Sequence, residues 1–131
     1  MLFIRFVVGH DSEKLNKLHG PFTEAKLLRD EGALRDYEVE QVEEVLFWFN
    51  DNLPCPPFES ENYPIDAVAW FKPNANDFIN RMHELSYILN EHNAYVRVIK
   101  TKSPGRKVYE DEYQVVYKQR ILSPTNFSYP D

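Results

Sequence analysis

The residues best suited to chemistry are positively charged side chains within apolar stretches predicted to be strands. Arg5 interrupts the apolar run 2–8, Arg97 stands between two valines, and Lys72 ends the stretch 65–72. A charge inside a strand is costly unless it is paired or exposed. Arginine binds carboxylate and phosphate groups through two parallel hydrogen bonds. If Arg5, Lys72 and Arg97 lie at one end or face of the sheet, they form an anion-binding site.

An acidic cluster, Glu110-Asp111-Glu112, comes directly after Tyr109 and has two interpretations. It can pair with bases across a hairpin, where each ion pair stabilises by fractions of a kcal/mol, roughly. Alternatively, Glu110 or Asp111 forms a base or a second polar wall of the anion site. The bases available for the hairpin are Arg97, Lys100, Lys102, Arg106 and Lys107.

Aromatic residues on two predicted helices fall outside the apolar stripes of those helices. Phe47 and Trp48 do so on the helix 37–52, and Tyr87 does so, with Ile88, on the next helix. Exposed Trp and Tyr are enriched at protein interfaces, and a self-complementary patch leads to a two-fold dimer. In the other interpretation, the proline-rich segment 53–64 folds over these aromatics and covers them.

Other kinds of chemistry lack a motif. The sequence has no Gly-rich phosphate loop, no pair of cysteines and no His-x-x-Glu-His pattern. Cys55 has no base or cation close in sequence to lower its pKa. The histidines are far apart in sequence (His10, His19, His83 and His92). We therefore predict no catalytic residue, metal site or cofactor.

Charge and composition narrow the functional class. The 131 residues include 21 acidic and 15 basic side chains, a net charge of −6 that makes nucleic-acid binding a poor expectation. No apolar run approaches the roughly 18 residues that a membrane span needs. The start lacks the features of a signal peptide, and a single cysteine fits a reducing compartment. We expect a cytoplasmic protein.

Hydrophobic periodicity predicts the elements that must position these residues. Strands are expected over 2–8, 65–72, 95–101 and 113–118, with a further short strand possible at 106–109. Helices are expected over 22–31, where Thr23 can act as the cap, over 37–52, and from a cap at Asn74 to about Asn90. The buried stripes are Val42, Val45, Leu46, Phe49 and Leu53 on the second helix, and Ala75, Phe78, Ile79, Met82, Leu85, Ser86 and Leu89 on the third.

The predicted order β-α-α-β-α-β-β indicates an α+β fold. We expect a two-layer domain with a mixed four-stranded sheet and about three helices, because helices joining strands favour parallel crossovers. Residues 1–122 are expected to form a single domain. The prolines and the lack of period predict a flexible C-terminal tail at 123–131.

Several strings resemble a family of small uncharacterised bacterial proteins over about residues 1–118. They are Arg5 in the first strand, Leu46 to Phe49, Trp70-Phe71-Lys72, and Pro104-Gly105 through Tyr109-Glu110-Asp111-Glu112-Tyr113-Gln114-Val115-Val116. The resemblance implies a single bacterial cytoplasmic domain and brings no known activity or ligand. It favours treating Lys72, Glu110, Asp111 and Gln114 as more than surface charge.

These observations predict a non-catalytic binding or interaction module. Its expected partners are a second copy of itself, forming a homodimer, or an unidentified protein, and an anionic small molecule is a further candidate. The alternative is a small enzyme or ligand-sensing domain that binds an anionic small molecule. Its pocket would be formed by Arg5, Lys72, Arg97, Glu110 and Asp111.

Overall fold

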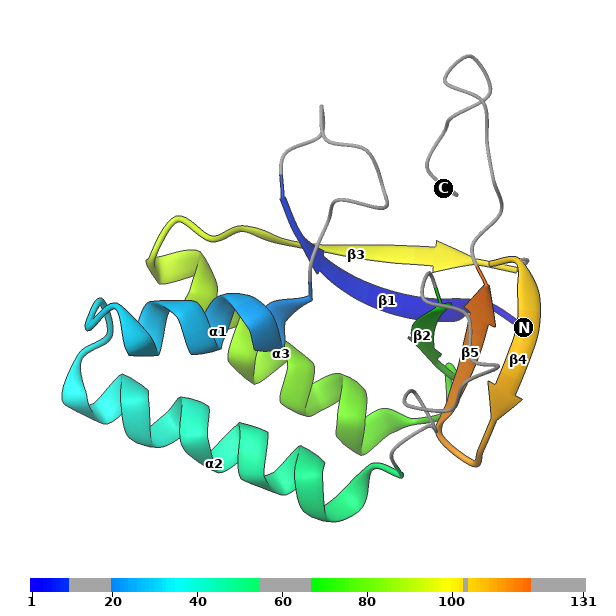
Figure 1. Cartoon of the computed structure of the whole chain (residues 1–131), viewed down its shortest axis with the longest axis horizontal. Helices are drawn as coiled ribbons and strands as arrows, with labels where there is room; N and C mark the ends of the chain where they lie inside the picture. The colour runs from blue at the N-terminus through cyan, green and yellow to red at the C-terminus, as the bar shows by residue number, and fades with distance from the viewer. Residues whose placement is uncertain (10–19, 55–66, 103, 119–131) are drawn as a thin grey trace. The chain divides into compact units, whose positions relative to one another are not determined.

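The computed structural model describes residues 1–9, 20–54, 67–102 and 104–118 (Figure 1). Within them lie three helices and five strands: β1 (Phe3–Val8), α1 (Pro21–Asp30), α2 (Asp36–Asn52), β2 (Ala67–Phe71), α3 (Asn76–Glu91), β3 (Val96–Thr101), β4 (Arg106–Glu110) and β5 (Gln114–Lys118). Cys55, the predicted C-terminal tail and most of the proline-rich segment 53–64 lie outside the described residues.

The strands form a sheet in the order β3-β1-β2-β5-β4. β1 pairs antiparallel with β2, β2 with β5, and β5 with β4. The α+β class is confirmed, but the prediction of a mixed four-stranded sheet is wrong: the described sheet has five strands and is antiparallel. The possible strand at 106–109 is a full member paired with β5. The two helices between β1 and β2 also return the chain in the opposite direction, instead of making a parallel crossover.

The contacts divide the chain into two compact units. The first comprises Met1–Arg5, Pro54–Asn76 and Ile99–Asp131. Its centre is the ladder of β2 and β5, in which Trp70 stands opposite Val115. Both side chains are buried, with exposed fractions of 3% and 1%. β-branched and aromatic residues fit such a half-covered pleated surface well, which explains why this part of the sequence forms strands.

The second unit comprises Phe6–Leu53 and Asp77–Val98 and holds the helices. α2 and α3 run antiparallel, because Trp48 contacts Phe78 at one end while Glu38 contacts His92 at the other. Most of the predicted apolar stripes are confirmed. The buried members are Val42, Val45 and Phe49 on α2 and Phe78, Met82, Leu85, Ser86 and Leu89 on α3.

The helix ends follow local backbone rules, with two shifts from the prediction. Gly32 closes α1 with a φ of 72°, and Asn93 follows α3 with a φ of 62°, both as expected for left-handed helix stops. α1 begins at Pro21 after Gly20, not at a Thr23 cap, because proline has the φ that the first helical position needs. α3 begins at Asn76, two residues after Asn74.

Candidate functional site

Arg5 and Trp70 form the most unusual contact of the first unit. The Arg5 guanidinium carbon lies 5.9 Å from the centre of the Trp70 ring. Ile4 stands opposite Phe71, so Arg5 and Trp70 are neighbours across the β1–β2 pair. The Nη1 atom of Arg5 and the Nε1 atom of Trp70 are both buried, and neither has an acceptor among the described residues. Burial lowers the pKa of Arg5 to about 10, so the guanidinium stays charged at neutral pH.

Lys72, by contrast, has an internal partner. Its Nζ atom lies 2.6 Å from Glu110 Oε2, and Lys107 Nζ lies 2.7 Å from Glu110 Oε1. The hydrogen bond from Lys107, and then the one from Lys72, lowers the pKa of Glu110 to about 2. The carboxylate is therefore ionised at any physiological pH and is not suited to general acid–base catalysis. The hairpin interpretation, in which acids pair with bases, applies to Glu110 and Lys107.

Asp111 and Gln114 organise the turn between β4 and β5. Asp111 Oδ1 accepts from the backbone N–H groups of Tyr113 and Gln114, at 2.8 and 3.1 Å. Its Oδ2 accepts from Tyr109 Oη at 2.8 Å and from Gln114 Nε2 at 3.0 Å. Gln114 Nε2 also donates to the Pro54 carbonyl at 2.7 Å. Burial raises the pKa of Asp111, but these donors outweigh it and hold the pKa below its ordinary value.

The structure thus gives different roles to the six residues predicted to bind a ligand. Lys72 and Glu110 pair with each other, and Asp111 and Gln114 hold a turn. Arg5 alone among these first-unit residues keeps a buried charged group without a described acceptor. Arg97 is half-buried in β3 and belongs to the second unit. A site that Arg97 shares with the others remains a prediction.

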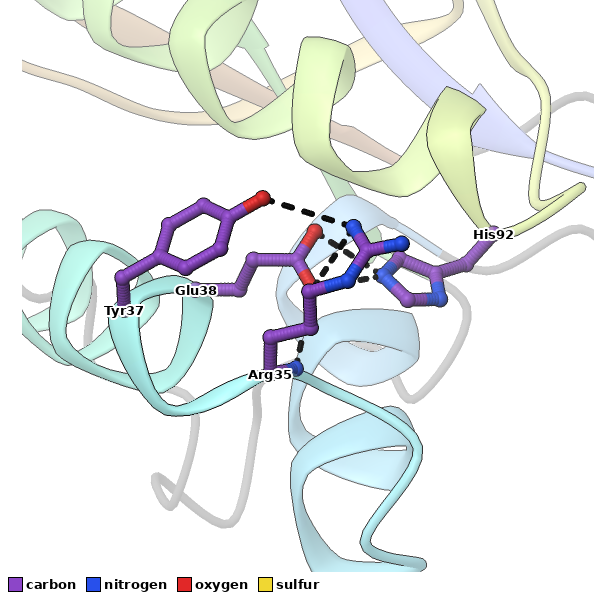
Figure 2. Close-up of polar contacts among 4 residues, drawn as sticks. All are labelled: Arg35, Tyr37, Glu38 and His92. Atoms are coloured by element: carbon purple, nitrogen blue, oxygen red, sulfur yellow. Dashed lines mark hydrogen bonds and ion pairs between the residues drawn. The ribbon is translucent and has the colours of Figure 1, made fainter.

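The second unit contains a polar cluster around the buried Glu38 that joins α2 to α3 (Figure 2). Glu38 is only 3% exposed, and both of its carboxylate oxygens lie 3.0 Å from His92 Nε2. The backbone N–H of Arg35 donates to Glu38 Oε1 at 2.9 Å, which is half of a helix capping box. The Arg35 guanidinium lies 3.9 Å from the same oxygen and also bonds to Tyr37 Oη.

The electrostatics of this cluster favour an ionised Glu38. Burial raises the pKa of Glu38, but the Arg35 N–H and the His92 imidazole outweigh it, so the pKa lies below its ordinary value. An ionised carboxylate only accepts hydrogen bonds, so His92 Nε2 is the donor in this contact. Glu38 lies in the first turn of α2 and His92 just past the end of α3, where helix dipoles favour a negative and a positive charge, respectively. The Glu38–His92 contact therefore links the N-terminal end of α2 to the C-terminal end of α3.

The predicted interface aromatics differ in exposure. Phe47 and Tyr87 are 68% and 71% exposed. Trp48 is only half-exposed, because it packs against Phe78 and lies beneath the Arg81 guanidinium at 5.1 Å. Ile88 is buried, so its grouping with the exposed aromatics is wrong. Two of the three predicted interface residues are therefore open on the described surface.

The positions of Glu38 and Trp70 in the sequence contain signals for buried polar contacts, and neither residue is among the predicted site residues. Glu38 falls on the buried stripe of α2, four residues before Val42 and seven before Val45. A carboxylate on an apolar stripe must find a buried donor, and this predicts a polar contact. Trp70 and Lys72 lie on the same face of the predicted strand. A buried indole N–H usually has a hydrogen-bond acceptor, so this position predicts a polar contact for Trp70.

The described residues hold no group of three or more His, Cys, Asp or Glu side chains arranged for a metal ion. Nor does any helix in this part of the chain have the length and apolar character for a membrane crossing. The chain matches no protein-family model, and searches of curated proteins and of solved structures likewise found no match. The function must therefore be argued from the geometry.

Proposed function

We propose that the protein is a non-catalytic binding module whose first unit takes an anionic ligand at Arg5 and Trp70. One observation carries this proposal: buried donors on two neighbouring residues, Arg5 Nη1 and Trp70 Nε1, have no acceptor among the described residues. Buried donors in native proteins nearly always have a partner, so an orphaned pair indicates a bound water, an ion or a ligand. A buried positive charge favours an anion among these.

The neighbouring charges support this assignment. Lys72 and Lys107 both bond to Glu110, so the carboxylate of Glu110 is already engaged. Asp111 likewise accepts four hydrogen bonds from its own turn. Neither acid is left to compensate the Arg5 guanidinium, and an external anion supplies the missing charge.

Thermal unfolding in a panel of anions at constant ionic strength tests this function. A ligand at one hundred times its Kd adds about 2.7 kcal/mol to the free energy of unfolding. We expect this stabilisation to disappear in Arg5→Met. Arg106→Met is the matched control, because it removes the same charge from an exposed position of β4. Equal stabilisation of both variants by the anions refutes the proposal.

Self-association through the second unit is a second candidate function. The exposure of Phe47 and Tyr87, which carry large apolar rings on α2 and α3, favours it. A second copy of the chain is the simplest partner, since closed two-fold dimers are the commonest oligomers. We also propose, from the family resemblance, that the protein is bacterial and cytoplasmic.

A further inference from the structure

We propose that the ligand of the Arg5–Trp70 site is a singly charged carboxylate, not a phosphate or sulfate dianion. This inference rests on the proposed function, because it names the class of anion that the same site takes. It follows from counting the charges and donors that the described residues leave available there.

The site offers one uncompensated positive charge. Lys72 could have added a second, but its Nζ atom lies 2.6 Å from Glu110 and its side chain is only 16% exposed. Lys107 reaches the same carboxylate, and more than half of its own side chain is exposed to solvent, where its charge is screened. A dianion at Arg5 therefore keeps one negative charge unpaired in a buried environment, which is strongly unfavourable.

The donor set also matches two acceptor oxygens. Arg5 contributes a charged N–H from the guanidinium, and Trp70 contributes a neutral N–H from a ring that is only 3% exposed. A carboxylate has two oxygens in one plane and can accept from both donors at once.

A nuclear magnetic resonance titration provides the direct test. The chain has two tryptophans, so the indole N–H region holds two signals, which Trp70→Phe assigns. We titrate the labelled protein with sodium acetate and, separately, with sodium sulfate at matched ionic strength. Acetate is expected to shift the Trp70 indole signal, with half-saturation at a concentration at least about tenfold below that of sulfate. The Trp48 indole signal is the internal control and should not move.

The outcomes separate the two proposals. If sulfate saturates the Trp70 signal at the same or a lower concentration than acetate, the carboxylate assignment is wrong while anion binding stands. If neither salt moves the signal, the proposed function itself fails. Trp70→Phe keeps an aromatic side chain but removes the indole N–H, so its acetate affinity, measured by thermal shift, should fall about fivefold. An unchanged affinity in Trp70→Phe overturns the two-donor assignment.

Discussion

His92 Nε2 lies 3.0 Å from both carboxylate oxygens of Glu38, and this contact joins the first turn of α2 to the end of α3. The carboxylate is almost fully buried and also accepts from the Arg35 N–H. The contact with His92 gives the Glu38 carboxylate a hydrogen-bond donor from another helix. Without it, the carboxylate would lie on the buried face of α2 with fewer partners. Breaking such a contact leaves a buried polar group without its partner, which is costly.

Glu38→Gln is expected to lower the free energy of unfolding at pH 7 by roughly 1–3 kcal/mol, because it removes a charge-assisted hydrogen bond. The pKa of Glu38 lies below the ordinary value of 4.5, so its stabilisation is complete above that pH. The stabilisation is lost as the pH falls through the folded-state pKa. Urea unfolding from pH 7 to pH 3 should therefore show the gap between wild type and variant closing in acid.

The matched control for this experiment is Glu40→Gln, at an exposed position of the same helix. It removes the same formal charge and should change stability by less than about 0.5 kcal/mol. A Glu38→Gln protein that is as stable as this control at pH 7 would show that the Glu38–His92 contact does not contribute to the free energy of unfolding.

Glu110 should titrate with a pKa of about 2, because Lys107 and Lys72 both donate to its carboxylate. Lys107→Met removes the larger of these effects and is expected to raise the pKa of Glu110 toward 4.5. Carbon-detected titration of the Glu110 carboxyl signal measures this directly. Lys102→Met serves as the control at an exposed position, and an equal shift in both variants would mean that the Lys107 contact is not the cause.

Asp111→Ala should destabilise the protein by roughly 1–3 kcal/mol, because the four hydrogen bonds that Asp111 accepts are lost at once. Asp111→Asn retains one carbonyl oxygen and should lose less. Glu112→Ala, its exposed neighbour, controls for the loss of a negative charge. Denaturant midpoints of the three variants provide the comparison, and equal midpoints for the two alanine variants contradict the role of Asp111 in the turn.

Phe47→Ser combined with Tyr87→Ser should shift the protein toward the monomer if the two exposed rings form the dimer contact. Sedimentation velocity over a range of concentrations measures the mass of the species. Tyr95→Ser is the control, since Tyr95 is 63% exposed in the same unit but was not assigned to the interface. A wild-type protein that sediments at one chain mass at every concentration rejects self-association.

The helices were largely predictable because their signal is local. The apolar stripe of α3 runs through Phe78, Met82 and Leu85, and all three are buried. Gly32 and Asn93 stand where the chain needs a left-handed residue, which their types permit. Strand pairing was less accessible, because it depends on residues far apart in sequence. The full participation of β4 in the sheet came only from its pairing with β5.

The candidate site was likewise predictable only where its signal is local in the sequence. The sequence alone identified Arg5 as a charge within an apolar strand, since that conflict is visible in three neighbouring residues. The sequence could not reveal that Lys72 is paired with Glu110 while Arg5 faces Trp70 without an acceptor among the described residues. Residue type determines which groups need a partner. Which groups find one depends on the pairing of distant segments, and that is decided only when the chain folds.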